Sequence, residues 1–234
     1  MISDNEQLIK HVTSTIEPDS FANFDLAYSP ANRYKTTFQE IGARELNLKN
    51  KAEVKEVISK YDLIFSVHCK QIFPAELVRS VKCINFHPGL NPSNRGWYPQ
   101  VFSIINKKPI GVTVHIMGEE IDHGPIIMQE AININPFDTS LDVYNRLIAL
   151  EKEIISKHLV DIIEERYVTS FPVSDGNYNS IQDFKELCKL DLNQIGTLGQ
   201  HIDLLRALTH DDFKNGYFKH QNEKIYVRIS FSRK

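Results

Sequence analysis

Residues 62–86 read DLIFSVHCKQIFPAELVRSVKCINF, and this stretch decides the fold class. Residues 62–67 form a short apolar run, which is typical of a strand buried in a parallel sheet. Residues 74–79 suit a short helix, and residues 81–86 suit the next strand. Strand and helix signals that alternate in this way predict an α/β domain with a mostly parallel sheet.

The same alternation continues on both sides of this stretch. Polar capping residues and apolar residues at helical spacing mark the flanking helices. The flanking elements that we expect are a helix from Asp4 or Asn5 to about Ile16, a strand over residues 24–28, a helix capped by Asn50 with Val54, Val57 and Ile58 on one face, a helix over residues 100–105, and strands over residues 111–116 and 125–134. A long helix follows from Thr139 or Ser140, with apolar residues at helical spacing as far as Ile162.

The C-terminal part of the chain has a different character. Residues 171–180 are polar and contain proline, glycine, asparagine and aspartate, so we interpret them as a linker loop. The elements expected after it are a helix over residues 198–208 and two strands over residues 216–219 and 224–232. The sequence therefore predicts one domain over residues 1–170 and a small helix-plus-hairpin unit over residues 171–234.

The composition excludes several classes of protein. Of the 234 residues, 41% are hydrophobic and 24% are charged, which is typical of a globular chain. The 27 basic and 30 acidic residues give a net charge of -3, so charge offers no argument for nucleic-acid binding. No apolar run approaches the roughly 20 residues of a membrane span, and the polar N-terminus does not suit a secretory signal. The three cysteines are scattered, which argues against a disulfide framework or a zinc ribbon and favours a reducing cytoplasm.

Polar residues gather at three points where a strand signal meets a loop. The stretches are SVHCKQIFP at residues 66–74, NFHPGLNPSNRGWYPQ at residues 85–100, and GVTVH with DHGPII at residues 111–115 and 122–127. In open α/β sheets, ligands bind in the crevice at the carboxyl ends of the strands. We therefore expect these stretches to converge in one site.

Three of these residues suggest a particular chemistry. Asn85 and His87 are two apart on a strand, so their side chains point to the same face. An asparagine amide can donate to a developing oxyanion, and a histidine can move a proton near neutral pH. Asp122 can orient or charge-balance His87 from a neighbouring loop. No hydroxyl or thiol nucleophile stands beside the histidine, which favours direct transfer of a group to an amine over a covalent enzyme intermediate.

Other interpretations of these residues stay open from the sequence. A single histidine at the end of a strand is most often only hydrogen-bonded, because buried polar groups usually find partners. His115, His123 and Asp122 can be read as metal ligands, although no histidine pair has the spacing of an HExxH zinc site. Cys69 beside His68 can be read as a nucleophile, although nothing in the sequence indicates an activated thiol.

The same stretches resemble a known family. Residues 85–89, 111–115 and 122–127 are similar to the formyltransferases that use 10-formyltetrahydrofolate, which include glycinamide ribonucleotide and methionyl-tRNA formyltransferases. The longer string over residues 85–103 is narrower, and it resembles the sugar N-formyltransferases that act on dTDP-linked amino-dideoxy sugars. The resemblance covers most of the chain from about residue 60 and includes residues 205–213.

The resemblance implies a catalytic set and two ligand regions. The implied catalytic residues are Asn85, His87 and Asp122. The folate pterin would lie against the loop before Asp122 and against Lys70, Gln71, Ile72 and Phe73. The residues implied near the sugar nucleotide are Asn94, Arg95, Trp97 and Tyr98. Arg95 and Arg206 are candidates for its pyrophosphate, because a guanidinium matches phosphate oxygens. The alternatives are that Trp97 is a core aromatic and that Arg95 and Arg206 are surface charges.

The resemblance also implies a reaction and a fold. The fold would be a Rossmann-like sheet of the formyltransferase type, flanked by helices. The reaction would move a formyl group from 10-formyltetrahydrofolate, without a metal, to the amine of a dTDP-amino-dideoxy sugar. The implied sugar is dTDP-4-amino-4,6-dideoxyglucose, used for cell-surface glycans such as the O-antigen of lipopolysaccharide.

Three alternative functions remain beside this reading. The acceptor could be a dTDP-3-amino sugar or methionyl-tRNA, and the weakly acidic chain argues against the tRNA. A protein that only binds folate or nucleotide is the third alternative, and the intact Asn85, His87 and Asp122 set argues against it.

The resemblance leads to one expectation for each end of the chain. The related sugar enzymes are similar in using C-terminal elements for dimer contacts, so we expect a two-fold homodimer. The alternative is that the C-terminal hairpin packs on its own chain. Relatives open with a hydrophobic first strand, whereas only Met1 and Ile2 precede Ser3 here, so we expect that strand to be shortened or lost.

Overall fold

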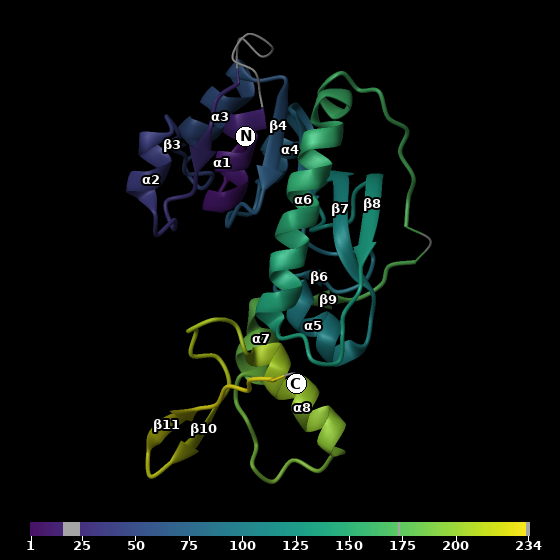
Figure 1. Ribbon diagram of the computed structural model, residues 1–234. Helices are drawn as coiled ribbons and strands as arrows, with labels where there is room; N and C mark the ends of the chain where they lie inside the picture. Colours follow the sequence, from purple (N-terminus) through teal and green to yellow (C-terminus); the bar gives the residue numbers. More distant parts are fainter. Residues whose placement is uncertain (16–23, 173, 233–234) are drawn as a thin grey trace.

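A seven-stranded sheet forms the centre of the computed structural model, which describes residues 1–15, 24–172 and 174–232 (Figure 1). Within this part of the chain, the strand order is β3-β2-β1-β4-β5-β7-β8. The strands are β1 (Ile2–Ser3), β2 (Ala27–Tyr28), β3 (Arg44–Glu45), β4 (Leu63–Val67), β5 (Lys82–His87), β7 (Ile110–Ile116) and β8 (Ile126–Ile132). The first five strands pair in parallel, while β7 is antiparallel to both β5 and β8. The expected mostly parallel sheet is confirmed.

The first strand is shortened but keeps a place inside the sheet. β1 has two residues, and it pairs in parallel with β2 on one side and β4 on the other. Ile2 is 2% exposed and Ser3 is fully buried. The centre of the sheet is therefore intact despite the short strand.

Eight helices surround the sheet and extend beyond it in the described residues. They are α1 (Glu6–Thr15), α2 (Lys35–Glu40), α3 (Lys51–Lys60), α4 (Ala75–Ser80), α5 (Pro99–Asn106), α6 (Ser140–Ile163), α7 (Ile181–Leu187) and α8 (Leu198–Leu208). The sequence did not anticipate α2, α7 or β3, which are too short for a clear hydrophobic period. Ile16, the expected end of the first helix, lies outside the described residues.

Capping side chains fix where the helices begin. Asn50 accepts a hydrogen bond from the amide of Ala52, and Thr139 forms a reciprocal capping box with Asp142. Asn5, rather than Asp4, caps α1, because its Oδ1 accepts from the amide of Leu8 at 3.0 Å.

The hydrophobic core divides between the two faces of the sheet. On one face, residues such as Phe65 and Phe86 pack with α1, α5 and α6. On the other face, residues such as Ile64 and Cys83 pack with α3 and α4. Because side chains alternate along β5, Asn85 and His87 lie on the face of Cys83, at the carboxyl end of the strand.

The expectation of a linker over residues 171–180 is wrong in part, because its last residues take part in a small second sheet. Tyr178–Asn179 form strand β9, which pairs in parallel with β6 (Arg95–Gly96). The amides of Arg95 and Trp97 donate to the carbonyls of Asn177 and Asn179. A pair of two-residue strands carries no period that a sequence pattern can reveal, and it fixes the 94–97 loop from outside the main sheet.

The C-terminal unit consists of α7, α8 and a hairpin. The hairpin strands are β10 (Tyr217–His220) and β11 (Glu223–Tyr226). The expected strand over residues 224–232 is wrong beyond Tyr226. There the amide of Ile229 donates to the side chain of Thr209, so the segment leaves the hairpin and follows the end of α8. Figure 1 shows α6 running from the sheet to this unit, which lies at the opposite end of the molecule from the N-terminus.

Candidate active site

Asn85, His87 and Asp122 meet at the carboxyl edge of the sheet. Asn85 and His87 lie in the last three residues of β5, and Asp122 lies in the loop between β7 and β8. Asn85 Nδ2 donates to Asp122 Oδ1 at 3.1 Å. His87 Nδ1 lies 3.6 Å from the same oxygen. Two residues of β5 therefore face one carboxylate oxygen of Asp122, which is more than 30 positions later in the sequence.

His115 joins this group from β7, where it is the register partner of Asn85. Its Nδ1 lies 3.1 Å from the carbonyl oxygen of Ile116, and its Nε2 lies 3.3 Å from Asn85 Nδ2. The same Nε2 lies 3.5 Å from Asp122 Oδ1, so His115 and Asn85 meet beside the Asp122 carboxylate. The sequence offered His115 only as a metal ligand.

His87 is buried and closely packed. The residue is 5% exposed, and a Cβ at position 89 would lie 2.3 Å from its Nε2, so only glycine fits at Gly89. Nε2 has no hydrogen-bond partner among the described groups. Burial lowers the pKa of His87 below its usual 6.5, although the charge of Asp122 opposes this shift. His87 is therefore neutral at pH 7, with Nε2 ready to accept a proton.

Asp122 is held as a fixed negative charge. Its φ is 53°, a conformation that is uncommon for a residue other than glycine and is often found at functional sites. The amide of Gly96 donates to Oδ2 at 3.1 Å, and Asn91 Nδ2 donates to the backbone carbonyl at 2.9 Å. Burial opposes ionisation, but the two histidines and the Gly96 amide outweigh it and bring the pKa of Asp122 below its usual 3.8. The carboxyl group is therefore ionised at neutral pH.

A polar cluster beneath the site fixes the loop after His87. Thr113 Oγ1 donates to the carbonyl of Gly89 at 2.7 Å and accepts from the amide of Asn91 at 3.0 Å. Gln129 Nε2 donates both to Thr113 Oγ1 and to the carbonyl of Asn91. Neither Thr113 nor Gln129 was expected at the site from the sequence. Their proximity follows from the pairing of β7 with β8, where the two are register partners, and that register is known only from the structure.

The residues expected to meet the folate have differing exposure. Gln71 is tied to the segment after β3, because its side chain bonds the amide of Leu48 and the carbonyl of Leu46. Phe73 is 7% exposed and belongs to the core, whereas Ile72 is 73% exposed. The amide of Lys70 donates to Asp4 Oδ2 at 2.7 Å. Ile72 and Lys70 are the exposed residues among these four.

Asn94, which was expected near the sugar nucleotide, lies in the interior of the protein. It is fully buried, its Nδ2 donates to Ser103 Oγ at 2.9 Å, and its Oδ1 accepts from Asn106, Asn177 and Asn179. These contacts tie the 94–97 loop to α5 and to β9.

Arg95, Trp97 and Tyr98, the other residues expected near the sugar nucleotide in this region, are more accessible than Asn94. Arg95 donates to the carbonyls of Ile121 and Asp175, while its Nε is buried without a hydrogen-bond partner among the described groups. Trp97 is 36% exposed, which does not fit the alternative of a core aromatic. The ring of Tyr98 lies 4.1 Å from that of Phe184, between centroids.

Arg206 lies in α8 and is 3% exposed, so the alternative of a surface charge is wrong. Its Nε donates to Asp203, and its Nη1 donates to the carbonyls of Asn135 and Asp138. These contacts anchor α8 to the loop before α6. Its role as a pyrophosphate ligand stays a prediction.

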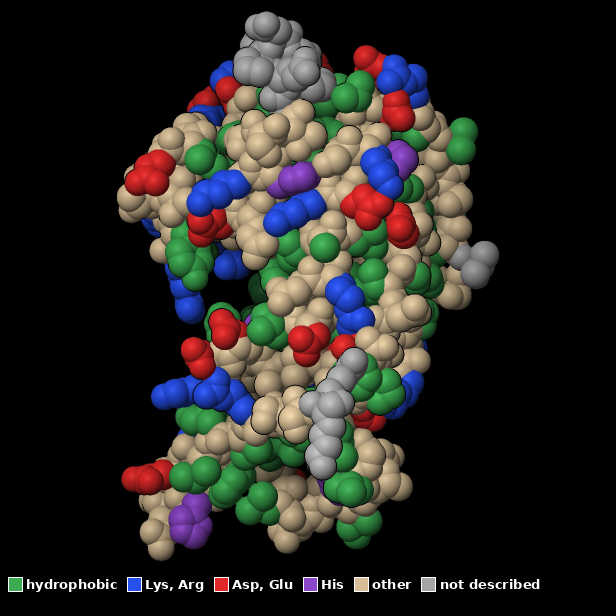
Figure 2. Space-filling view, in the orientation of Figure 1, with side chains coloured by type: hydrophobic (Ala, Val, Ile, Leu, Met, Phe, Trp, Pro, Cys, Tyr) green, Lys and Arg blue, Asp and Glu red, His purple; other side chains and the backbone are tan. Residues whose placement is uncertain are grey.

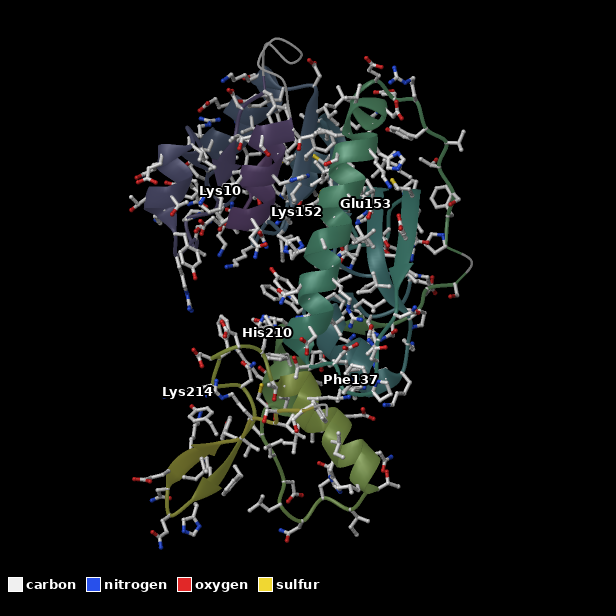
Figure 3. The ribbon with its side chains drawn as sticks, in the orientation of Figure 1. Lys10, Phe137, Lys152, Glu153, His210 and Lys214 are labelled. Atoms are coloured by element: carbon white, nitrogen blue, oxygen red, sulfur yellow. The ribbon has the colours of Figure 1, made fainter. Side chains whose placement is uncertain are left out.

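A hollow separates the N-terminal part of the molecule from the C-terminal unit in the space-filling view, and basic side chains border it (Figure 2). His210, which follows α8, is labelled at the lower side of this hollow in Figure 3. His210 is one of a line of rings: its ring lies 5.3 Å from that of Tyr144 and 5.8 Å from that of Phe213.

The geometry gives little support to a cysteine nucleophile or to a metal site. Burial raises the pKa of the Cys69 thiol to about 12, which does not suit a nucleophile. Cys69, Cys83 and Cys188 are free. Among the described residues, no group of three or more His, Cys, Asp or Glu is placed to hold a metal ion. None of the helices in this part of the chain is long and apolar enough to cross a membrane.

Exhaustive chelation is expected to leave activity unchanged. One carboxylate, one amide and two imidazoles are a poor ligand set for zinc or magnesium. The measurement is turnover before and after dialysis against a strong chelator. Activity that falls on chelation and returns with a divalent ion would revive the reading of His115, Asp122 and His123 as ligands.

Two protein-family profiles match the chain. The family described as Formyl transferase matches residues 17–159, and the N-formyltransferase dimerization C-terminal domain matches residues 183–233. The first match alone spans more than half of the chain.

Individual proteins are similar over most of their length. The dTDP-4-amino-4,6-dideoxyglucose formyltransferase of Mycobacterium bovis is 48% identical over 75% of this chain and 76% of its own. The crystal structure of a sugar N-formyltransferase from a Shewanella species has 47% identity and a TM-score of 0.96, covering 99% of this chain and 96% of the other. A 4-N formyltransferase from Francisella tularensis has 42% identity and a TM-score of 0.89, with the same coverage.

Proposed function

This chain belongs to the formyltransferase family, and from that premise we propose that it moves the formyl group of 10-formyltetrahydrofolate to the amine of a dTDP-linked amino-dideoxy sugar. The first candidate acceptor is dTDP-4-amino-4,6-dideoxyglucose, because the similar Mycobacterium protein carries that name. The observation that carries the proposal is the convergence of Asn85, His87 and Asp122 on one carboxylate oxygen. The free cysteines favour a reducing cytoplasm as its location.

His87 would take the proton that the amine loses as it attacks the formyl carbon. The neutral ring has Nδ1 toward Asp122 and Nε2 without a partner, so Nε2 is the atom that accepts. The proton then passes to the folate nitrogen that leaves, and Asp122 stabilises the imidazolium between these two steps. Proton transfer by a positioned group contributes about 10²–10⁴-fold.

Asn85 would stabilise the negative charge that develops on the formyl oxygen. In the free protein its two N–H groups face Asp122 and His115, at 3.1 Å and 3.3 Å. We assign the longer of these contacts, to His115, as the one that yields when the oxyanion forms. One such donor contributes about 10²–10³-fold.

The two substrates would approach from different loops. For the folate, two exposed apolar side chains are available, Ile72 in the loop after β4 and Ile121 next to Asp122, at 73% and 40% exposure, and a pterin ring needs apolar cover. For the sugar nucleotide, Trp97 offers an exposed ring for a base or sugar, and Arg95 offers a guanidinium for the pyrophosphate.

We propose further that residues 1–170 act as the catalytic domain and that residues 171–234 hold two chains together as a homodimer. The hairpin supports this proposal. Phe218 and Ile225 are register partners on one face of it, and they belong to neither described core cluster, whereas Tyr217 on the other face packs against the core. The apolar face is therefore free to meet a second chain.

Ile225→Glu is expected to convert the dimer to a monomer, because it buries a charge at the proposed interface. Val168→Glu is the matched control: Val168 is also apolar and is 88% exposed, but lies outside the C-terminal unit. Light scattering at micromolar concentration gives the mass of each. A native protein that is monomeric, or an Ile225→Glu variant that stays dimeric, would contradict this interface.

The test of the proposed function is a product assay. The purified protein is incubated with 10-formyltetrahydrofolate and with a panel of dTDP-3-amino and dTDP-4-amino sugars, and products are read by mass spectrometry. We expect a gain of one formyl group on dTDP-4-amino-4,6-dideoxyglucose. Gain only on a 3-amino sugar would change the acceptor, and no gain on any member of the panel would overturn the proposal.

A further inference from the structure

His68 and Glu151 form a buried pair that the mechanism above does not use. His68 directly follows β4, at the same edge of the sheet as His87, and Glu151 lies in α6. His68 Nε2 is 2.7 Å from Glu151 Oε2, and their side chains are 11% and 0% exposed. Burial of a carboxylate is costly without a partner, so this pair calls for a reason.

Among the described residues, His68 is the basic side chain that lies within ion-pair distance of Glu151. Neither carboxylate oxygen, nor His68 Nε2, has a hydrogen bond of good geometry. The hydroxyl of Tyr144, also on α6, accepts from Asn5 Nδ2, and burial together with the charge of Glu151 raises the pKa of Tyr144 to about 12. Tyr144 therefore stays neutral and does not protonate the carboxylate.

The backbone and surroundings of His68 point to function rather than to packing. Its φ is 53°, the strained region for a side chain of this kind, and its carbonyl accepts from the amide of Asp4. His68 lies close enough to His87 that a positive charge on it lowers the pKa of His87. The titratable groups around it are thus Glu151 and Tyr144 from α6, His87 from β5, and Asp4 before α1.

His68 also lies at one end of the line of rings that includes His210 at the hollow. Its ring is 6.0 Å from that of Tyr144, which leads through His210 to Phe213, and Phe213 is 56% exposed. These ring contacts therefore connect His68 to an exposed aromatic side chain.

We propose that His68, held by Glu151, accepts the surplus proton of the incoming sugar amine, a role that rests on the proposed function. A primary amine is mostly an ammonium ion at pH 7 and has no lone pair with which to attack. One proton passes from the ammonium to His68, whose positive charge Glu151 then balances. The neutral amine attacks the formyl carbon, its second proton goes through His87 to the leaving folate nitrogen, and His68 releases the first proton to solvent. The net reaction yields formamide, tetrahydrofolate and one proton.

The test is the pH dependence of kcat/KM in His68→Gln. Without His68, the variant can use only the small fraction of amine that is already neutral in solution. We therefore expect its kcat/KM to be about 10²-fold lower at pH 7. The loss should shrink by about tenfold per pH unit until the amine itself titrates. The Kd for dTDP should not change. His158→Gln, a histidine on α6 outside the pair, is the matched control and should follow the native profile.

Glu151→Gln tests the pair with an isosteric change, and it serves alone if His68→Gln fails to fold. It should lower kcat/KM at pH 7 with the same recovery at high pH, and should have no further effect when combined with His68→Gln. A loss that is constant with pH, or full activity of His68→Gln at pH 7, would overturn the role of His68. If the native protein formylates no amino sugar, the proposed function fails instead, and the two failures are distinguishable.

Discussion

His87→Asn is expected to lower turnover by at least about 10²-fold while the protein remains folded. Asparagine keeps a polar side chain of smaller size but cannot accept and return a proton at neutral pH. The buried Nε2, which has no hydrogen-bond partner among the described groups, is lost, and with it the path of the proton from the amine to the leaving nitrogen. Steady-state kinetics at saturating substrates give the turnover, and thermal melting checks the fold.

His123→Asn is the control for this change. His123 adjoins Asp122 in sequence, but its side chain is 34% exposed and its ion-pair contacts are with Glu120 and Asp175. It should keep native turnover. If His87→Asn also turns over at close to the native rate while folded, His87 is not the proton carrier.

Asp122→Asn is expected to cause a similarly large loss in turnover with little change in the affinity for dTDP. The change keeps the shape of the side chain but removes the charge that faces His87 Nδ1 at 3.6 Å and accepts from Asn85 and Gly96. The imidazolium that forms during the reaction then has no counter-charge. Turnover and calorimetric binding of dTDP measure the two effects separately.

Glu120→Gln removes a carboxylate from the same loop and is the control. The side chain of Glu120 is 80% exposed, so its charge is largely screened by solvent. A loss that Asp122→Asn confines to dTDP affinity would make Asp122 a substrate ligand instead of a partner of His87.

Much of the sheet was predictable because its strands are apolar runs of ordinary length. Residues 62–67 and 81–86 correspond to β4 and β5, and the expected long helix begins after Thr139 as anticipated. The pairing of Asn85 and His87 on one face followed from the two-residue period of a strand. The approach of Asp122 was expected because ligand-binding loops gather at the carboxyl ends of the strands, and the resemblance implied the same set, but no period relates a loop residue to a strand 35 positions earlier.

What could not be predicted depends on tertiary contacts. The parallel pair of β6 and β9 has two residues in each strand, and the cluster around Asn94 draws amides from two separate segments, at Asn106 and at residues 177–179. Asn94 therefore looked like an exposed loop residue in the sequence, although it is fully buried. The pairing of His68 with Glu151 spans 83 positions, and only the crossing of α6 over the sheet reveals it.

The most direct test of formyl transfer at Asn85, His87 and Asp122 is a crystal structure with a dTDP-4-amino sugar and an unreactive formylfolate analogue bound together. The distances to measure run from the sugar amine nitrogen to the formyl carbon and to His87 Nε2. Both should be about 3–3.5 Å, the separation of atoms that are about to react, with the formyl oxygen toward Asn85 Nδ2. An amine bound beyond hydrogen-bond reach of His87, with its formyl partner away from Asn85, would contradict the assignment of the reaction to this cluster.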